Sequence, residues 1–178
     1  MSAKIKAKKE EDPFSEFKTD RRPSPGQLFV YLPSAIAVTL IPLYLYHSIF
    51  GMDLQSYAPL FAVVTALSTL FVTIAYHNIS FWLKTRLSTQ RDKILTKGSV
   101  TDKVSDKKVA LENKKQSQAA VTRTESMAFS ILYNNALFLF SVLVLAFIVF
   151  KNASAPYNYV FSIALSAGLL SFTSSASV

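Results

Sequence analysis

The chain has 178 residues, of which 51% are hydrophobic and only 17% are charged, whereas roughly a quarter of a soluble domain is charged. It contains no cysteine, which excludes disulfide bonds, thiolate metal sites and a cysteine nucleophile. Nineteen Lys and Arg against eleven Asp and Glu give a formal net charge of +8, which favours anionic partners. The composition argues against one ordinary soluble domain.

The charged residues are confined to a few places. They occupy Lys4–Arg22, Asp53, Lys84–Glu125 and Lys151, and leave four long uncharged stretches. Each stretch includes an apolar run of the roughly 20 residues that a helix needs to cross a bilayer. The sequence therefore predicts an all-α membrane protein with four transmembrane helices, at residues 27–50, 55–80, 127–150 and 156–175. The run 136–150 has no polar face, which argues against soluble helices.

The N-terminal residues 1–26 mix lysines with acidic residues and contain no apolar core of a signal peptide. They end in Pro23, Pro25 and Gly26. We expect a largely disordered cytosolic tail, followed by a first span that serves as an uncleaved targeting signal.

The distribution of basic residues predicts the orientation in the membrane. The tail holds seven Lys and Arg and the central segment eleven, against Lys151 alone in the two short connections. By the positive-inside rule, both termini and the central segment lie in the cytosol. The turns 51–53 and 151–155 are then exoplasmic. Asn152 heads a glycosylation sequon there, but it is too close to the bilayer for us to expect its modification.

The expected spans contain no Asp, Glu, Lys or Arg, which argues against a pump, a coupled transporter or a channel for charged substrates. His47 and His77 lie near span ends beside tyrosines, as in the aromatic belts that anchor membrane helices. No catalytic or metal-ligating motif is present. We expect a protein that is not an enzyme and has no cofactor or metal.

Polar and small residues within the spans predict helix packing. Two amides lie about two turns into the third span and need hydrogen-bond partners, and small residues four apart in the last span allow close backbone approach. The candidates are Asn134, Asn135, Ser162, Ser166 and Gly168, the last paired with Ala164. They are expected to pack within the chain or to contact a separate membrane subunit. Ala62 and Ala66 form a similar pair in the second span.

The central segment 84–125 holds eleven cations and five acids. Leucines and isoleucines at helical spacing predict that the second span continues as a helix and stops at Gly98. A second helix is expected to begin near Thr101 or Ser105, which gives a basic helical hairpin. Thr122 and Glu125 fit a capping box immediately before the third span. The candidate contact residues are Lys84, Arg86, Arg91, Lys93, Lys97, Lys103, Lys107, Lys108, Lys114 and Lys115.

Three roles fit such a segment. It can bind the anionic cytoplasmic leaflet, bind RNA phosphates, or act only as a signal for topology. No RNA-recognition motif or aromatic stacking platform is present. An RNA contact would therefore read backbone shape rather than sequence.

Four strings carry a resemblance to a known family: FGMDLQS (50–56), AYHNISFWLK (75–84), AFSILYNNALFLF (128–140) and FKNASAPYNYVFSIALSAGLLSF (150–172). They resemble the gamma subunit of the translocon-associated protein (TRAP) complex, also called signal sequence receptor subunit gamma. The strings reach parts of all four expected spans. The tail and most of 88–120 are similar to the family in charge and length only.

The resemblance implies a multi-pass protein of the endoplasmic reticulum membrane that assembles with the TRAP alpha, beta and delta subunits beside the Sec translocon channel. It implies an accessory role in co-translational translocation and membrane insertion, with cytosolic helices docked on the large ribosomal subunit, including its rRNA. Two alternatives from other classes are a small channel or transporter for a neutral solute and a polybasic lipid-binding scaffold.

Overall fold

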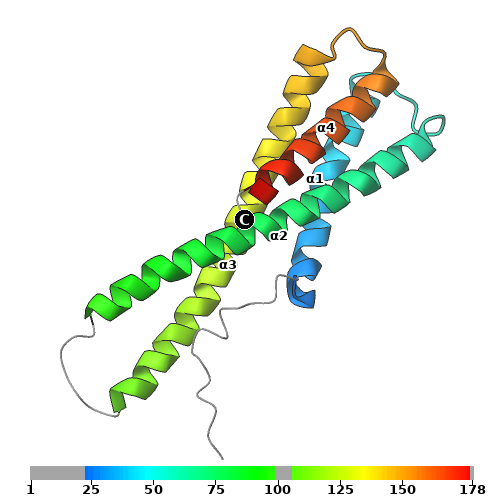
Figure 1. The fold of residues 1–178 in the computed structure, drawn as a ribbon. Coiled ribbons are helices and arrows are strands. Elements are labelled where there is room, and N and C mark those ends of the chain that lie inside the picture. The colour runs from blue at the N-terminus through cyan, green and yellow to red at the C-terminus, as the bar shows by residue number, and fades with distance from the viewer. Residues whose placement is uncertain (1–22, 99–105, 177–178) are drawn as a thin grey trace, which may run out of the picture.

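The computed structural model describes residues 23–98 and 106–176 (Figure 1). Within these residues all regular secondary structure is helical. The elements are α1 (Pro25–Ser48), α2 (Ala58–Gly98), α3 (Asp106–Val144), the π-helical turn η1 (Leu145–Val149) and α4 (Ala155–Ala176). Four helices in the described part of the chain are long and apolar enough to cross a membrane, with mean hydropathy between 1.4 and 2.2. The predicted fold class is confirmed, whereas the tail at 1–22 lies outside the described residues.

The helix α2 is the centre of the bundle, because it packs against α1, α3 and α4. It has 41 residues and α3 has 39, against 24 in α1 and 22 in α4. At 1.5 Å per residue, α2 and α3 are each about 60 Å long, roughly twice the hydrocarbon core of a bilayer. Both continue past the ends of the shorter helices (Figure 1).

The bundle is apolar outside and partly polar inside, the reverse of a soluble protein. Phe29, Leu132 and Phe172 are 82%, 69% and 73% exposed. Serine, threonine and asparagine side chains from all four helices are buried, among them Ser162. This arrangement suits hydrocarbon surroundings, in which polar groups must find partners inside the protein.

Four tyrosines fill much of the interior. Tyr31, Tyr46, Tyr76 and Tyr159 are all fully buried. The rings of Tyr46 and Tyr159 meet edge to face with centroids 5.0 Å apart, and the Phe61 ring also meets the Tyr159 ring edge to face, at 4.9 Å. Such edge-to-face packing adds to the area that the rings bury.

The turn between α1 and α2 covers residues 49–57 and is longer than the sequence predicted. Gly51 has a φ of 64°, which a residue with a side chain adopts only with strain. The Asp53 carboxylate accepts hydrogen bonds from the Ser56 hydroxyl at 2.7 Å and from the Ser56 N–H at 3.0 Å. These bonds lower the pKa of Asp53 below its ordinary value.

Candidate functional site

The most unusual feature of the fold is the helical hairpin that α2 and α3 form beyond the shorter helices. We call residues 84–98 of α2 and 106–125 of α3 its two arms. The α2 helix ends at Gly98, as predicted, and the α3 helix begins at Asp106. The first arm holds five cations and one acid, and the second holds five cations and three acids.

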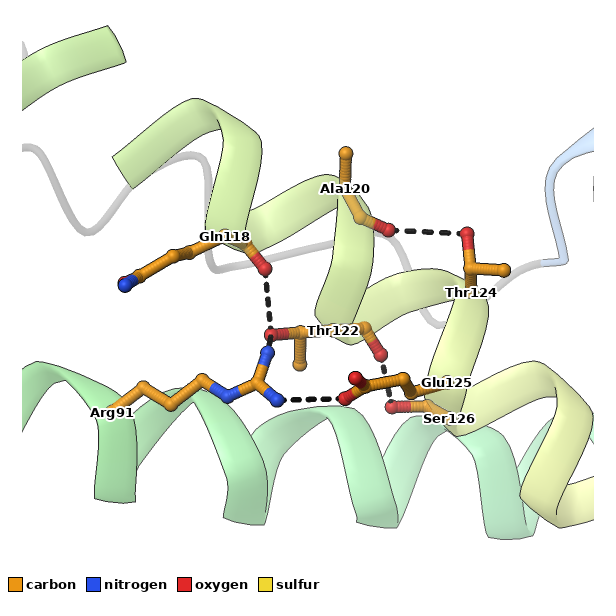
Figure 2. A network of polar contacts seen from close by, with 7 residues as sticks. All are labelled: Arg91, Gln118, Ala120, Thr122, Thr124, Glu125 and Ser126. Carbon is orange, nitrogen blue, oxygen red and sulfur yellow. Dashed lines mark hydrogen bonds and ion pairs between the residues drawn. The ribbon is translucent and has the colours of Figure 1, made fainter. Parts of the chain in front are cut away.

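A hydrogen-bonded clamp joins the two arms (Figure 2). Arg91 in α2 donates from Nη1 to the Thr122 hydroxyl at 2.5 Å and from Nη2 to the Glu125 carboxylate at 2.7 Å. The Thr122 hydroxyl in turn donates to the Gln118 carbonyl at 2.7 Å. The Ser126 hydroxyl donates to the Thr122 carbonyl at 2.6 Å. The clamp therefore connects one side chain of α2 with consecutive turns of α3.

The predicted capping box at Thr122 and Glu125 is wrong. The helix α3 is continuous from Asp106 to Val144, so no helix begins after Thr122. Its first N–H groups lie far upstream, and both side chains are turned to Arg91 instead (Figure 2). A capping box and an interhelical contact need the same residue types, so the spacing alone could not separate them.

Other described cations lie near the bundle. The Arg86 guanidinium lies over the Trp82 ring, 4.9 Å from its centroid. Burial lowers the pKa of the half-buried Lys84 below its ordinary value, and the nearby charge of Arg123 lowers it further. Arg123 donates from Nη2 to the Ser24 hydroxyl at 2.8 Å, which ties α3 to the start of α1.

The remaining predicted contact residues are placed only in part. Lys103 lies outside the described residues. The helical backbone includes the positions of six lysines whose side chains also lie outside the described part, namely Lys93, Lys97, Lys107, Lys108, Lys114 and Lys115.

The two amides predicted to mediate packing meet α2 inside the chain. Asn134 is buried, and its Nδ2 donates to the Ser130 carbonyl at 2.8 Å and approaches the Ala75 carbonyl at 3.5 Å. The Ser130 hydroxyl donates to the Tyr76 carbonyl at 2.6 Å. The Asn135 Oδ1 accepts a hydrogen bond from the Tyr76 hydroxyl. Ser130 and these amides thus attach α3 to one turn of α2.

Sequence reasoning missed Asn158, the most fully bonded side chain of the interior. Its Oδ1 accepts from the Tyr46 hydroxyl at 2.6 Å and from the Ser162 hydroxyl at 2.8 Å. Its Nδ2 donates at 3.0 Å to each of the carbonyls of Ala146 and Phe150, which end the third span. An amide in an uncharged span was the signal that could have identified it.

The small residues of α4 fall into two groups. Ser162 and Ser166 are buried, although the Ser166 hydroxyl has no hydrogen-bond partner among the described residues. A Cβ added at Gly168 would meet no atom within 4 Å, and Ala164 is exposed. The close approach predicted at Gly168 is therefore not made within the described chain.

An apolar groove of about 680 Å³ lies between α1 and α2. Its walls include Leu40 and Leu43 from α1, and Ala62 and Ala66 line it from α2. The predicted small pair of the second span thus borders an open groove rather than a close helix contact. No group of three His, Asp or Glu side chains that could hold a metal occurs in the parts of the chain that the structure describes.

The inverted polarity and the four long apolar helices define a multi-pass α-helical membrane protein. Comparison with known families matches residues 10–176 to the translocon-associated protein, gamma subunit (TRAP-gamma). The Translocon-associated protein subunit gamma of Dictyostelium discoideum is 41% identical over 168 residues, which cover 94% of this chain and 98% of that protein. The chain belongs to the TRAP-gamma family, and is a translocon-associated subunit.

Proposed function

We propose that the chain is a non-enzymatic accessory subunit of the endoplasmic reticulum translocon and that its hairpin docks the TRAP complex on the ribosome. The observation that carries the proposal is the continuation of α2 and α3 beyond the shorter helices as two arms rich in Lys and Arg. Neutralising phosphates with such side chains releases counterions, which makes binding favourable and dependent on salt.

The proposal places both termini and the hairpin in the cytosol, where ribosomes are. The charge asymmetry of the sequence supports this orientation. The spans would hold the subunit beside the Sec channel and against the alpha, beta and delta subunits. Gly168 is the proposed subunit contact in α4, because a Cβ added there would meet no atom within 4 Å of the described chain.

Charge reversal tests the docking. Lys107, Lys108, Lys114 and Lys115 are changed together to Glu in the full-length chain, and ribosome co-sedimentation of proteoliposomes is measured across salt concentrations. A matched control reverses the four lysines of the tail, Lys4, Lys6, Lys8 and Lys9. We expect the hairpin variant to lose binding, the control to retain it, and wild-type binding to fall steeply with salt.

The same assay separates the alternatives. Equal loss in both variants would indicate a general effect of net charge and would contradict docking by the hairpin. Binding of the wild-type chain to ribosome-free anionic vesicles at least as strong as to ribosomes would favour the lipid scaffold. Solute flux through the purified chain alone would favour the channel.

A further inference from the structure

Charge alone assigned Arg91 to the surface that contacts the polyanion, but its guanidinium is occupied inside the hairpin. It bonds Thr122 and Glu125 through different nitrogens, at 2.5 and 2.7 Å (Figure 2). We propose that Arg91, Thr122 and Glu125 form a clamp that fixes the two arms for binding, and that Arg91 is a positioning residue rather than a contact. This inference rests on the proposed docking function.

The arms need such a clamp because both carry a net positive charge and repel each other. Arg91–Glu125 is an ion pair that bridges α2 and α3. Its side chains are 31% and 44% exposed, so water screens the ion pair itself. The hydrogen bond to Thr122, a residue that is only 3% exposed, is shielded from water and therefore fixes the orientation of the Arg91 side chain, which a screened ion pair does not.

The geometry of the clamp requires an arginine. The Thr122 hydroxyl donates to the Gln118 carbonyl, so its oxygen is free to accept from Arg91. A planar guanidinium reaches this oxygen and the Glu125 carboxylate at once, through two nitrogens in a fixed fork. A lysine would bring the same charge without the fork.

Holding the arms together lowers the conformational entropy that binding would otherwise remove. The clamp and simple electrostatics therefore predict opposite effects of removing the Glu125 charge on ribosome binding. Glu125 is negative, and on a surface that binds an anion its removal should strengthen binding. If it positions the arms, its removal should weaken binding.

The test compares full-length variants in proteoliposomes by their affinity for purified eukaryotic ribosomes. T122V and R91K each remove a hydrogen bond of the clamp, E125Q removes its ion pair, and E112Q removes the same charge elsewhere in α3. We expect the three clamp variants to bind about fivefold more weakly, the effect of about one net hydrogen bond. E112Q should bind as well as or better than wild type. Tighter binding by E125Q together with unchanged binding by R91K would overturn the inference.

A second measurement tests the clamp without ribosomes. The chain has no cysteine, so Gln90 and Ala119, exposed positions on the two arms, can be spin-labelled as Q90C and A119C. Double electron–electron resonance should give one narrow distribution of distances between the two spin labels, and this distribution should broaden in E125Q, T122V and R91K. Unchanged widths would refute the clamp. If the wild-type chain does not bind ribosomes although its distance distribution is narrow, the docking function is refuted and the clamp is not.

Discussion

The buried amide of Asn158 offers the sharpest test of what holds the spans together. From α4 it reaches α1 through Tyr46 and the end of the third span through the carbonyls of Ala146 and Phe150, and it bonds Ser162 one turn further along α4. The substitution Asn158→Leu keeps a similar volume but removes all four hydrogen bonds. It leaves the Tyr46 hydroxyl and two carbonyls to find other partners.

The magnitude follows from the number of bonds. Hydrogen bonds between membrane helices average about 0.6 kcal/mol, so the three bonds from Asn158 to other elements amount to about 1.8 kcal/mol, and the fourth, to Ser162, lies within α4. We expect Asn158→Leu to lower the free energy of unfolding by that amount. Unfolding is followed by helicity as sodium dodecyl sulfate is titrated into mixed micelles. Tyr46→Phe removes one bond and should lower it by about 0.6 kcal/mol.

The control is Asn152→Leu, the same substitution at an exposed position of the turn after the third span. It should change the free energy of unfolding by less than about 0.5 kcal/mol. If Asn158→Leu is as mild as this control, the four bonds do not stabilise the bundle. A double-mutant cycle between Tyr46→Phe and Asn158→Leu should then show no coupling either.

Three further expectations concern single groups. Gly51→Ala should lower the free energy of unfolding by about 1 kcal/mol, because φ is 64° and no contact compensates, whereas Gly51→Asn should be milder in the same titration. Folding lowers the pKa of Asp53, so the stability that its carboxylate gives the turn should be complete above the ordinary pKa range of Asp and should be lost as the pH falls through the folded pKa. Ser56→Ala should raise the pKa of Asp53 toward 3.8, which is measured from the NMR shift of the carboxyl carbon. In α4, Ser162→Ala should lower the free energy of unfolding and Ser166→Ala should not, since the Ser162 hydroxyl donates to Asn158 whereas the Ser166 hydroxyl has no hydrogen-bond partner among the described residues. Equal losses would contradict the assignment.

The helices could be predicted because each span is an uncharged run, and hydrocarbon admits few alternatives to a helix. Gly98 likewise marked the end of α2, since glycine disfavours helix continuation. For the start of α3 the sequence left two candidates, Thr101 and Ser105, and the helix begins at Asp106, next to the second of them.

The partners of the polar side chains could not be predicted. Arg91 lies 31 residues from Thr122 and Tyr46 lies 112 residues from Asn158, so no local spacing relates them. The capping box failed for the same reason, because Thr122 and Glu125 were read as neighbours in sequence rather than as partners of another helix. The π-helical turn at 145–149 left no sequence signal either, since its residues are as apolar as those before it.

The unbroken lengths of α2 and α3 have a mechanical consequence. After Pro59, α2 has no proline and no glycine before Gly98, and α3 has neither, so the residues that most often kink a helix are missing from both. Each therefore behaves as a stiff lever that crosses the bilayer. A tilt of about 5° shifts one end of a rod about 60 Å long by about 5 Å relative to the other. If the hairpin docks on a partner as proposed, movement of that partner would reach the opposite membrane face without any change in the fold.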